Sequence, residues 1–322
     1  MFDFDPAEYK NFFYGITTRR ILFEKKLFPF TLWGEDLILF WNDGEPVCYQ
    51  NFCPHYGLPL DQGKLKNGHI ECGFHGWQFD LSDGELTNAP LAQKQPTCCL
   101  KKYATLVRGG IVFIYPGNES GRESAEQKIL QTVTPANASN STVYPVPFYL
   151  AMNSSMDFPH HAFHTLFYSI YGLYRNILGR RNPLLTTYTP VPLEESEDYF
   201  KYRINETGVE LTVHPFCTEY HDSQAKNIWQ IFVRPIDNVS SQYLITIHSY
   251  SKNPLYRVIV YLVFRTIIRH VAMPEDVRWL GTSYKHWEKG INLNLCDHDY
   301  GMKQYLKKFM RTKKSPVSYE QP

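Results

Sequence analysis

Two short segments decide the fold of this chain: Cys53-Pro54-His55 and Cys72-Gly73-Phe74-His75. Each segment contains one cysteine and one histidine, and sixteen residues separate His55 from Cys72. Thiolate and imidazole are ligands that soft and borderline transition metals prefer. Because each segment supplies one ligand of each kind, one metal ion can take both thiolates while a second takes both imidazoles.

This ligand pattern suits a Rieske [2Fe–2S] cluster, in which two cysteines hold one iron and two histidines hold the other. The alternative is a Cys₂His₂ zinc site, but zinc fingers usually place both cysteines in one pair and both histidines in the other. Trp77 and Phe79 can shield a cluster from solvent. Several glycines allow tight turns and close backbone approach, namely Gly57, Gly63, Gly68, Gly73 and Gly76. The sequence therefore favours iron–sulfur over zinc.

Four stretches resemble the Rieske domain of Rieske-type non-haem iron oxygenases. They are residues 9–15 (YKNFFYG), 51–60 (NFCPHYGLPL), 72–80 (CGFHGWQFD) and 110–117 (GIVFIYPG). The resemblance extends more weakly over most of the remaining chain. It implies an α+β protein: an N-terminal all-β Rieske domain, then a helix-grip (START-like) antiparallel sheet domain whose long helix carries a mononuclear iron.

The 322 residues are enough for two domains. We expect a Rieske domain with its entry segment at residues 1–120, a polar linker at 121–145, and a catalytic mononuclear iron domain at 146–322. Turn signals at Asp43-Gly44 and Ser82-Asp83-Gly84 predict antiparallel hairpins in the first domain. Further strands and helices are predicted in the second: strands at 199–205, 210–215, 229–235 and 242–251, and helices at 254–273 and 300–311.

The second cluster of metal ligands is the segment Asp157-Phe158-Pro159-His160-His161-Ala162-Phe163-His164. With Pro159 early in a helix, His160 and His164 are one turn apart and face the same way. Two histidines and one carboxylate form the facial triad of non-haem iron(II) oxygenases. The resembling enzymes usually leave four residues between these histidines, and here three intervene. His161 therefore remains a rival ligand. The alternative is that these histidines are hydrogen-bonded surface or core residues that bind no metal.

The resemblance places the third iron ligand at Asp276, near the start of a helix. Glu275 is a near rival, and Asp297 and Asp299 are more distant ones. An aspartate at the positive end of a helix dipole is the structural alternative for Asp276.

The resemblance also gives Asp157 a role outside the iron coordination sphere. It implies that this carboxylate bridges an iron-ligating histidine to a cluster-ligating histidine of a neighbouring subunit. Electrons would pass from the cluster through His75, Asp157 and His160 to the iron, which implies a head-to-tail homotrimer. Asn153 is a weaker candidate for an asparagine that the family often carries nearby.

The chain has neither a Gly-x-Gly-x-x-Gly fingerprint nor a second cysteine cluster, so we expect a separate reductase or ferredoxin to supply electrons. The implied reaction uses O₂ to hydroxylate or oxidatively dealkylate a small, apolar or ring-containing substrate, with monooxygenation favoured over dioxygenation. Pocket walls are predicted from the aromatic residues Phe163, Phe167, Tyr168, Tyr171, Phe216 and Trp229. The alternatives are a Rieske electron carrier fused to a ligand-binding domain and a zinc-stabilised binding protein.

Composition constrains the partners and the compartment. The net charge of +1 gives no indication of nucleic-acid binding. The acidic start of the chain lacks a signal-peptide n-region, and the seven cysteines show no disulfide spacing, so we expect a cytoplasmic protein. Residues 254–273 are too short an apolar run for a membrane span and contain Arg257, Arg265 and Arg269. A buried or amphipathic helix is favoured, and peripheral membrane contact is the less favoured alternative.

Overall fold

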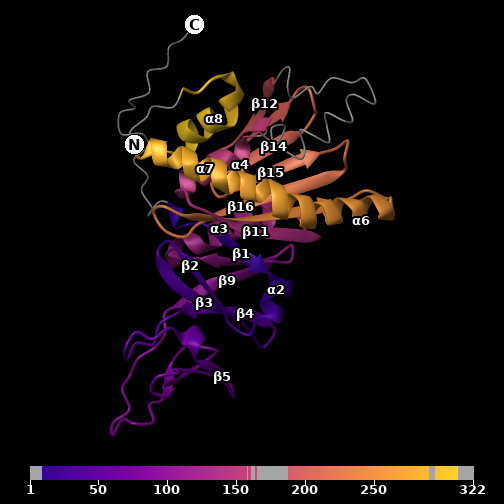
Figure 1. Ribbon diagram of the computed structural model, residues 1–322. Coiled ribbons are helices and arrows are strands. Elements are labelled where there is room, and N and C mark those ends of the chain that lie inside the picture. The colour runs from indigo at the N-terminus through magenta and orange to yellow at the C-terminus, as the bar shows by residue number, and fades with distance from the viewer. Residues whose placement is uncertain (1–8, 158, 161–163, 165–187, 290–293, 311–322) are drawn as a thin grey trace. The chain divides into compact units, whose positions relative to one another are not determined.

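The computed structural model describes residues 9–157, 159–160, 164, 188–289 and 294–310. The chain divides into two compact units (Figure 1). One comprises Ala7–Pro135 with Arg234–Asn238, and the other comprises Met1–Pro6, Ala136–Val233 and Val239–Pro322. Each unit is built around antiparallel sheet, which confirms the α+β class. The amino-terminal unit is mainly β but not all-β, because it also contains two α-helices in its described part.

The amino-terminal unit contains a six-stranded antiparallel sheet in the order β1-β10-β9-β4-β3-β2 among its described residues. The predicted Asp43-Gly44 turn joins β3 to β4, and both of its residues have positive φ, as a two-residue hairpin turn requires. The strands are β1 (Tyr14–Thr18), β2 (Phe28–Leu32), β3 (Glu35–Asn42), β4 (Glu45–Gln50), β9 (Lys102–Arg108) and β10 (Ile111–Tyr115). A short helix, α2 (Arg19–Glu24), follows β1.

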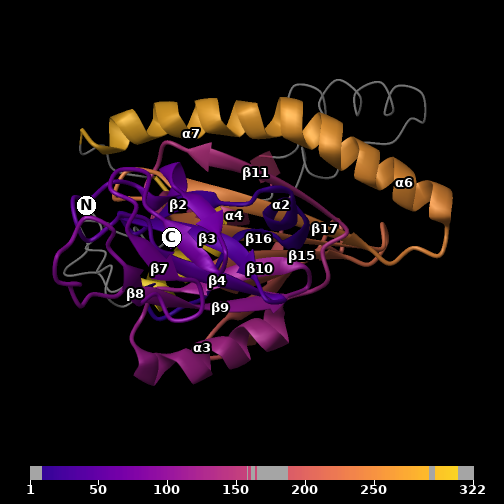
Figure 2. The same ribbon diagram turned by 90° about the horizontal axis from the view of Figure 1, so that it is seen from below.

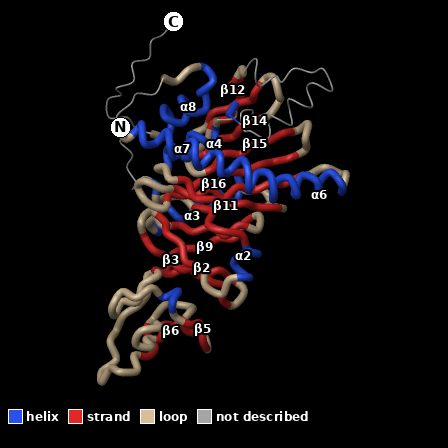
Figure 3. The backbone as a smooth tube through the Cα atoms, viewed as in Figure 1, coloured by secondary structure: helices blue, strands red, loops and turns tan. Residues whose placement is uncertain are grey.

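Four short strands form a second antiparallel sheet in this unit, and loops make up much of the chain around it (Figure 3). They are β5 (Lys64–Lys66), β6 (His69–Glu71), β7 (Gln78–Asp80) and β8 (Leu86–Asn88). A 3₁₀ turn, η1 (Leu60–Gln62), precedes β5. The predicted Ser82-Asp83-Gly84 hairpin lies between β7 and β8, where Gly84 has φ +81° and an added Cβ would lie 2.7 Å from the Tyr49 ring.

The predicted linker at residues 121–145 is wrong. This segment contains most of α3 (Glu119–Thr132) and all of β11 (Ala138–Tyr144), and the boundary between the units falls at Pro135 and Ala136. The sequence did not predict α3, because this helix buries only Ala125 and Ile129 and so has no clear apolar stripe.

The carboxy-terminal unit has a seven-stranded antiparallel sheet, in the order β11-β17-β16-β15-β14-β13-β12 over the described residues. The four strands predicted here are confirmed within two residues at their starts and ends, and β12 and β15 are additional. Besides β11 the strands are β12 (Pro190–Glu195), β13 (Phe200–Ile204), β14 (Glu210–His214), β15 (Cys217–Asp222), β16 (Asn227–Pro235) and β17 (Ser241–Ser249).

One continuous helical rod packs along β11 and β17 of this sheet (Figure 2). It consists of α6 (Pro254–Val263), the π-helix η4 (Phe264–Ala272) and α7 (Met273–Trp287). The predicted helix at 254–273 is therefore confirmed but continues for a further fourteen residues. Pro254 begins it, capped by the Asn253 side chain, which accepts from the Leu255 and Tyr256 amides. No helix in the described part of the chain is long and apolar enough to span a membrane.

Two further helices lie in the described part of this unit. α4 (Phe148–Met156) ends just before Asp157, and α8 (Tyr300–Phe309), which confirms the predicted C-terminal helix, packs against it. A 3₁₀ turn, η5 (Asp297–Asp299), precedes α8. These helices fix the chain that leads into the histidine segment.

Candidate functional site

The two Cys/His loops of the amino-terminal unit close in the same way. In the first loop the Gly57 amide donates to the Cys53 carbonyl at 2.8 Å, and the Cys53 amide donates to Leu58 at 2.9 Å. In the second, the Gly76 amide donates to the Cys72 carbonyl at 3.0 Å. Both glycines have positive φ, a conformation that side chains on Cβ disfavour. The loops are thus matched turns that each present one cysteine and one histidine.

The thiols and the imidazoles of these loops occupy different environments. Cys53 and Cys72 are buried in the hydrophobic core of the four-stranded sheet, whereas His55 is exposed. The His55 and His75 rings lie 4.8 Å apart, and Trp77 stacks on His55 at 4.4 Å. Two buried thiols and two adjacent, more exposed imidazoles match the donor set of a Rieske cluster, in which two cysteines would hold one iron and two histidines the other.

Burial also sets the protonation of the thiols. Burial raises the pKa of Cys53 to about 11, with a further contribution from Cys72. Since the thiolate is the ligand, binding of a cluster releases protons from this pair. The residues present therefore fit a cluster that supplies the positive charge needed to hold two thiolates in the core.

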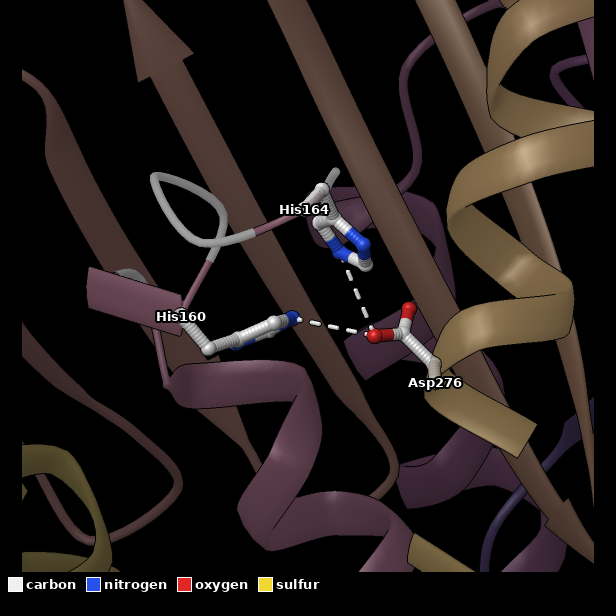
Figure 4. A group of neighbouring side chains, drawn as sticks. All are labelled: His160, His164 and Asp276. Carbon is white, nitrogen blue, oxygen red and sulfur yellow. Dashed lines mark ion pairs between the residues drawn. The ribbon is translucent and has the colours of Figure 1, made fainter. Parts of the chain in front are cut away.

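In the carboxy-terminal unit, His160, His164 and Asp276 come together from distant segments (Figure 4). One donor atom from each lies within 4.8 Å of the others. His160 Nε2 is 3.4 Å from Asp276 Oδ1, and His164 Nε2 is 3.2 Å from the same oxygen. Neighbouring ligands about 2.1 Å from one metal ion lie roughly 3 Å apart. The two imidazoles and the carboxylate therefore fit the facial triad that holds iron(II).

The charges of these three residues reinforce one another. Burial opposes ionisation of Asp276, but hydrogen bonds from His160 and His164 outweigh it and hold its pKa well below its usual range. Burial alone would lower the pKa of His160, but Asp157 and Asp276 raise it to about 10. A metal ion bound here takes the place of this proton.

Carboxylates also contact the outer nitrogens of both histidines. His164 Nδ1 lies 2.8 Å from Glu275 Oε2, and Trp279 stacks on the His164 ring at 5.1 Å. His160 Nδ1 bonds to the Asp157 main-chain carbonyl, and the Asp157 carboxylate lies 3.6 Å from the same nitrogen. Such contacts leave Nε2 of each ring directed at the metal position.

The histidine segment does not form the predicted helix where it is described. Pro159 and His160 lie in a 3₁₀ turn and His164 lies in a bend. Nε2 of each imidazole nevertheless lies close to the same Asp276 oxygen, which the first turn of α7 presents. Of the rival ligands, His161 lies outside the described residues, while Glu275 contacts His164.

The remaining rivals are also placed. Asp299 accepts from the Cys296 amide at the start of η5, and neither it nor Asp297 belongs to the His160–His164–Asp276 group. Asn153 lies on α4 and does not line the cavity that adjoins the three residues, which is described next.

A cavity of about 260 Å³ adjoins the three residues. Its walls are mostly apolar. They come from the sheet, the turn before β14, α4 and the η4–α7 part of the rod: Tyr144, Ser154, Val209, Tyr220, Asp222, Trp229, Ile231, Tyr243, Ile245, Ile268, Ala272 and Met273. The hydroxyls of Tyr220 and Tyr243 donate to the main-chain carbonyls of Ser155 and Ala151 in α4, so their rings face the cavity as apolar surface.

The sequence identified only part of this wall. Trp229 lines the cavity as predicted, whereas Phe216 is buried elsewhere. The other predicted aromatic residues, Phe163, Phe167, Tyr168 and Tyr171, lie outside the described residues. Among the wall residues that sequence reasoning missed, Ile231 lies two residues from Trp229 on β16, and Tyr243 and Ile245 lie two residues apart on β17. Their two-residue period is the signal that could have identified them.

Comparison with known proteins agrees with this geometry. The Rieske [2Fe-2S] domain family matches residues 14–104. Pheophorbide a oxygenase of Arabidopsis thaliana is 37% identical over 109 residues, which are 30% of this chain and 20% of that protein. The matched segment thus spans about a fifth of this relative.

Two solved structures share the fold over nearly the whole chain. Dicamba monooxygenase bound to dicamba superposes with a TM-score of 0.73 at 15% identity, covering 93% of this chain and 96% of its own. The oxygenase of a fluorene-bound oxygenase–ferredoxin complex of carbazole 1,9a-dioxygenase gives 0.68 at 18% identity, covering 94% and 91%. The chain therefore contains a Rieske [2Fe–2S] domain and has the two-unit fold of the Rieske-type non-haem iron oxygenases.

Proposed function

We propose that this chain is the oxygenase component of a Rieske non-haem iron system. It would use O₂ and two externally supplied electrons to hydroxylate or oxidatively dealkylate a small organic substrate. The observation that carries the proposal is the convergence of His160, His164 and Asp276 beside the apolar cavity. An electron carrier without oxygen chemistry has no use for such a group, so the alternative function is not favoured.

The iron supplies the site of O₂ binding and activation, and the protein supplies position and shielding. His160, His164 and Asp276 would hold the iron, and the adjoining cavity would hold the substrate. The apolar walls exclude water and orient the substrate by packing, since few polar side chains line the cavity. A compact substrate with one or two rings suits these walls, and monooxygenation is the proposed reaction.

Electrons would reach the cluster from a separate reductase or ferredoxin, and the carbazole 1,9a-dioxygenase complex shows an oxygenase with a ferredoxin bound. Transfer from cluster to iron is proposed to cross between subunits of a homotrimer. Two features support this route: the Asp157 side chain is 47% exposed beside His160, and His75 is only partly buried at the tip of its loop. The seven free cysteines suit a reducing compartment such as the cytoplasm.

A single-turnover experiment tests this proposal. Iron-loaded protein, reduced with dithionite and freed of excess reductant, is mixed with ¹⁸O₂ and a panel of small aromatic and aryl ether compounds. The expected result is a product that carries ¹⁸O or has lost an alkyl group as aldehyde, together with oxidation of the cluster. Cluster oxidation without any product across the panel, in protein that holds two irons per chain, would establish the electron carrier instead.

A further inference from the structure

Helix α6 carries an apolar face that points away from the sheet. Leu255, Val258, Ile259 and Leu262 follow the spacing i, i+3, i+4 and i+7, which places them on one side of the helix. All four side chains are at least half exposed, from 50% for Ile259 to 67% for Leu255. Single exposed apolar residues are ordinary, but a contiguous row on one helix face indicates an interaction surface.

The opposite side of the same rod faces the sheet. Phe264 is fully buried, and Ile268, Ala272 and Met273 line the cavity. The Tyr256 hydroxyl donates to the Ala225 carbonyl and so fixes the beginning of α6 to the turn before β16. These contacts fix the orientation of the rod about its own axis relative to the sheet. The apolar row on α6 is exposed because it lies on the side turned away from the sheet.

Charges of one sign surround this row. Lys252, Arg257, Arg265 and Arg269 are exposed, and residues 252–274 contain no aspartate or glutamate. A helix that combines an exposed apolar face with basic flanks has the composition of helices that lie in the interface of anionic membranes. A second copy of this chain is a poorer occupant, because a two-fold contact through α6 would bring the same arginines together.

We propose that the outer face of α6, formed by Leu255, Val258, Ile259 and Leu262, docks on an anionic lipid surface. The apolar side chains enter the headgroup region while the arginines beside them contact lipid phosphates. The rod does not cross the bilayer. This proposal departs from the sequence-based expectation that membrane contact is unfavoured, because the sequence did not show which face of the helix the sheet would leave exposed.

Docking in this way gives the cavity access to membrane-dissolved compounds. The rod that lies on the lipid at α6 lines the cavity at η4 and at the start of α7. This consequence, which rests on the proposed oxygenase function, extends the substrate class to apolar molecules that partition into lipid. Membrane docking itself does not depend on that function.

Vesicle flotation with the iron-loaded full chain tests the proposal. The expected result is binding to vesicles containing phosphatidylglycerol and weak binding to pure phosphatidylcholine, with affinity falling as salt rises. The double substitution Val258→Asp with Ile259→Asp should reduce binding at least tenfold. Arg257→Gln with Arg265→Gln should reduce it about tenfold or more and flatten the salt dependence. Leu91→Asp, at an 80% exposed position in the other unit, should leave binding unchanged.

Two results would overturn the proposal. Absence of flotation with both vesicle types in wild-type protein is one. The other concerns the Val258→Asp/Ile259→Asp variant. If light scattering shows a changed oligomeric state while vesicle binding is unchanged, the face is a contact between copies of the chain. The iron content and the paramagnetic resonance signal of the reduced cluster monitor folding in every variant, so a failure here is distinct from a failure of the oxygenase proposal.

Discussion

The imidazole of His164 donates from Nδ1 to the carboxylate of Glu275 at a distance of 2.8 Å. Glu275 directly precedes Asp276, so the first turn of α7 contains two carboxylates that make different contacts. Asp276 faces the metal position, and Glu275 contacts the far side of the histidine ring. The same turn therefore supplies one ligand and orients another.

Glu275→Gln should weaken iron binding at the triad about ten- to hundredfold, because the amide is a poorer acceptor for His164 Nδ1–H and orients the ring less firmly. The [2Fe–2S] cluster should be unaffected. Competitive titration with an iron(II) chelator, followed by the spectrum of the nitric oxide complex, measures both affinity and ligand geometry. Glu197→Gln, at an exposed turn, is the matched control. Unchanged affinity and spectrum would contradict a positioning role for Glu275.

Asp157→Asn should separate the two redox centres while leaving both loaded. The asparagine keeps the shape of the side chain but removes the charge that is 3.6 Å from His160 Nδ1. In stopped-flow mixing of reduced protein with O₂ and substrate, cluster oxidation should slow by about ten- to hundredfold. Equal rates in the variant and wild type, at equal iron content, would remove Asp157 from the electron path.

Ile231→Trp should block the cavity without removing iron. Ile231 lines the cavity from β16, and a larger side chain there fills it at a stability cost of about 1–3 kcal/mol. Calorimetry with naphthalene as an apolar ring probe should show an affinity at least tenfold lower than wild type. Ile228→Trp is the control, because alternation along the strand turns that side chain to the other face of the sheet. A similar loss in both variants would show that the cavity is not the binding site.

Glu35 should make the amino-terminal unit sensitive to acid. Burial opposes ionisation of this carboxyl, but hydrogen bonds from Tyr103, Lys101 and Lys10 outweigh it and lower its pKa from 4.5 to about 2. A lowered folded-state pKa stabilises the fold above the unfolded-state value, and this stabilisation declines as pH falls from about 4.5 towards 2.

Substitution measures this contribution directly. Glu35→Gln should lower the free energy of unfolding by about 1 kcal/mol at pH 7, a modest value because the side chain is 33% exposed and solvent screens the ion pairs. Urea unfolding at pH 7 and pH 3 should show a smaller difference from wild type at the lower pH. Glu45→Gln, an exposed residue at the start of β4, controls for the loss of one charge. A difference that grows on acidification would contradict the assignment.

The cluster loops could be predicted from sequence because each loop carries its ligands, glycines and closing hydrogen bonds within a few residues. The triad was harder to predict from sequence, since 111 residues lie between His164 and Asp276. The resemblance, and not the spacing, identified the carboxylate. Glu275 entered as a rival ligand, and its contact with His164 depends on the rotation of α7, which no local pattern encodes. The expected helix through His160 and His164 is not formed at Pro159 and His160, yet the structure brings both imidazoles to Asp276, and their role as iron ligands stays a prediction.

Other misses follow from weak local signals. Helix α3 buries too few apolar side chains to show a stripe, and the polar sequence suggested a linker. Strand β15 alternates threonine, tyrosine and charged residues, and it is recognisable only beside β14 and β16. The exposed row on α6 was visible as apolar sequence, but which face the sheet would cover depends on the tertiary packing of the rod.

Iron per chain, measured with the electron paramagnetic resonance spectrum of dithionite-reduced protein, tests the central claim most directly. The proposed function predicts three irons and a Rieske signal in wild type. His164→Ala should hold two irons with the Rieske signal intact, because only the triad loses a ligand. Two irons in both proteins, or a third iron retained in His164→Ala, would contradict the assignment of His160, His164 and Asp276 as the oxygen-activating site.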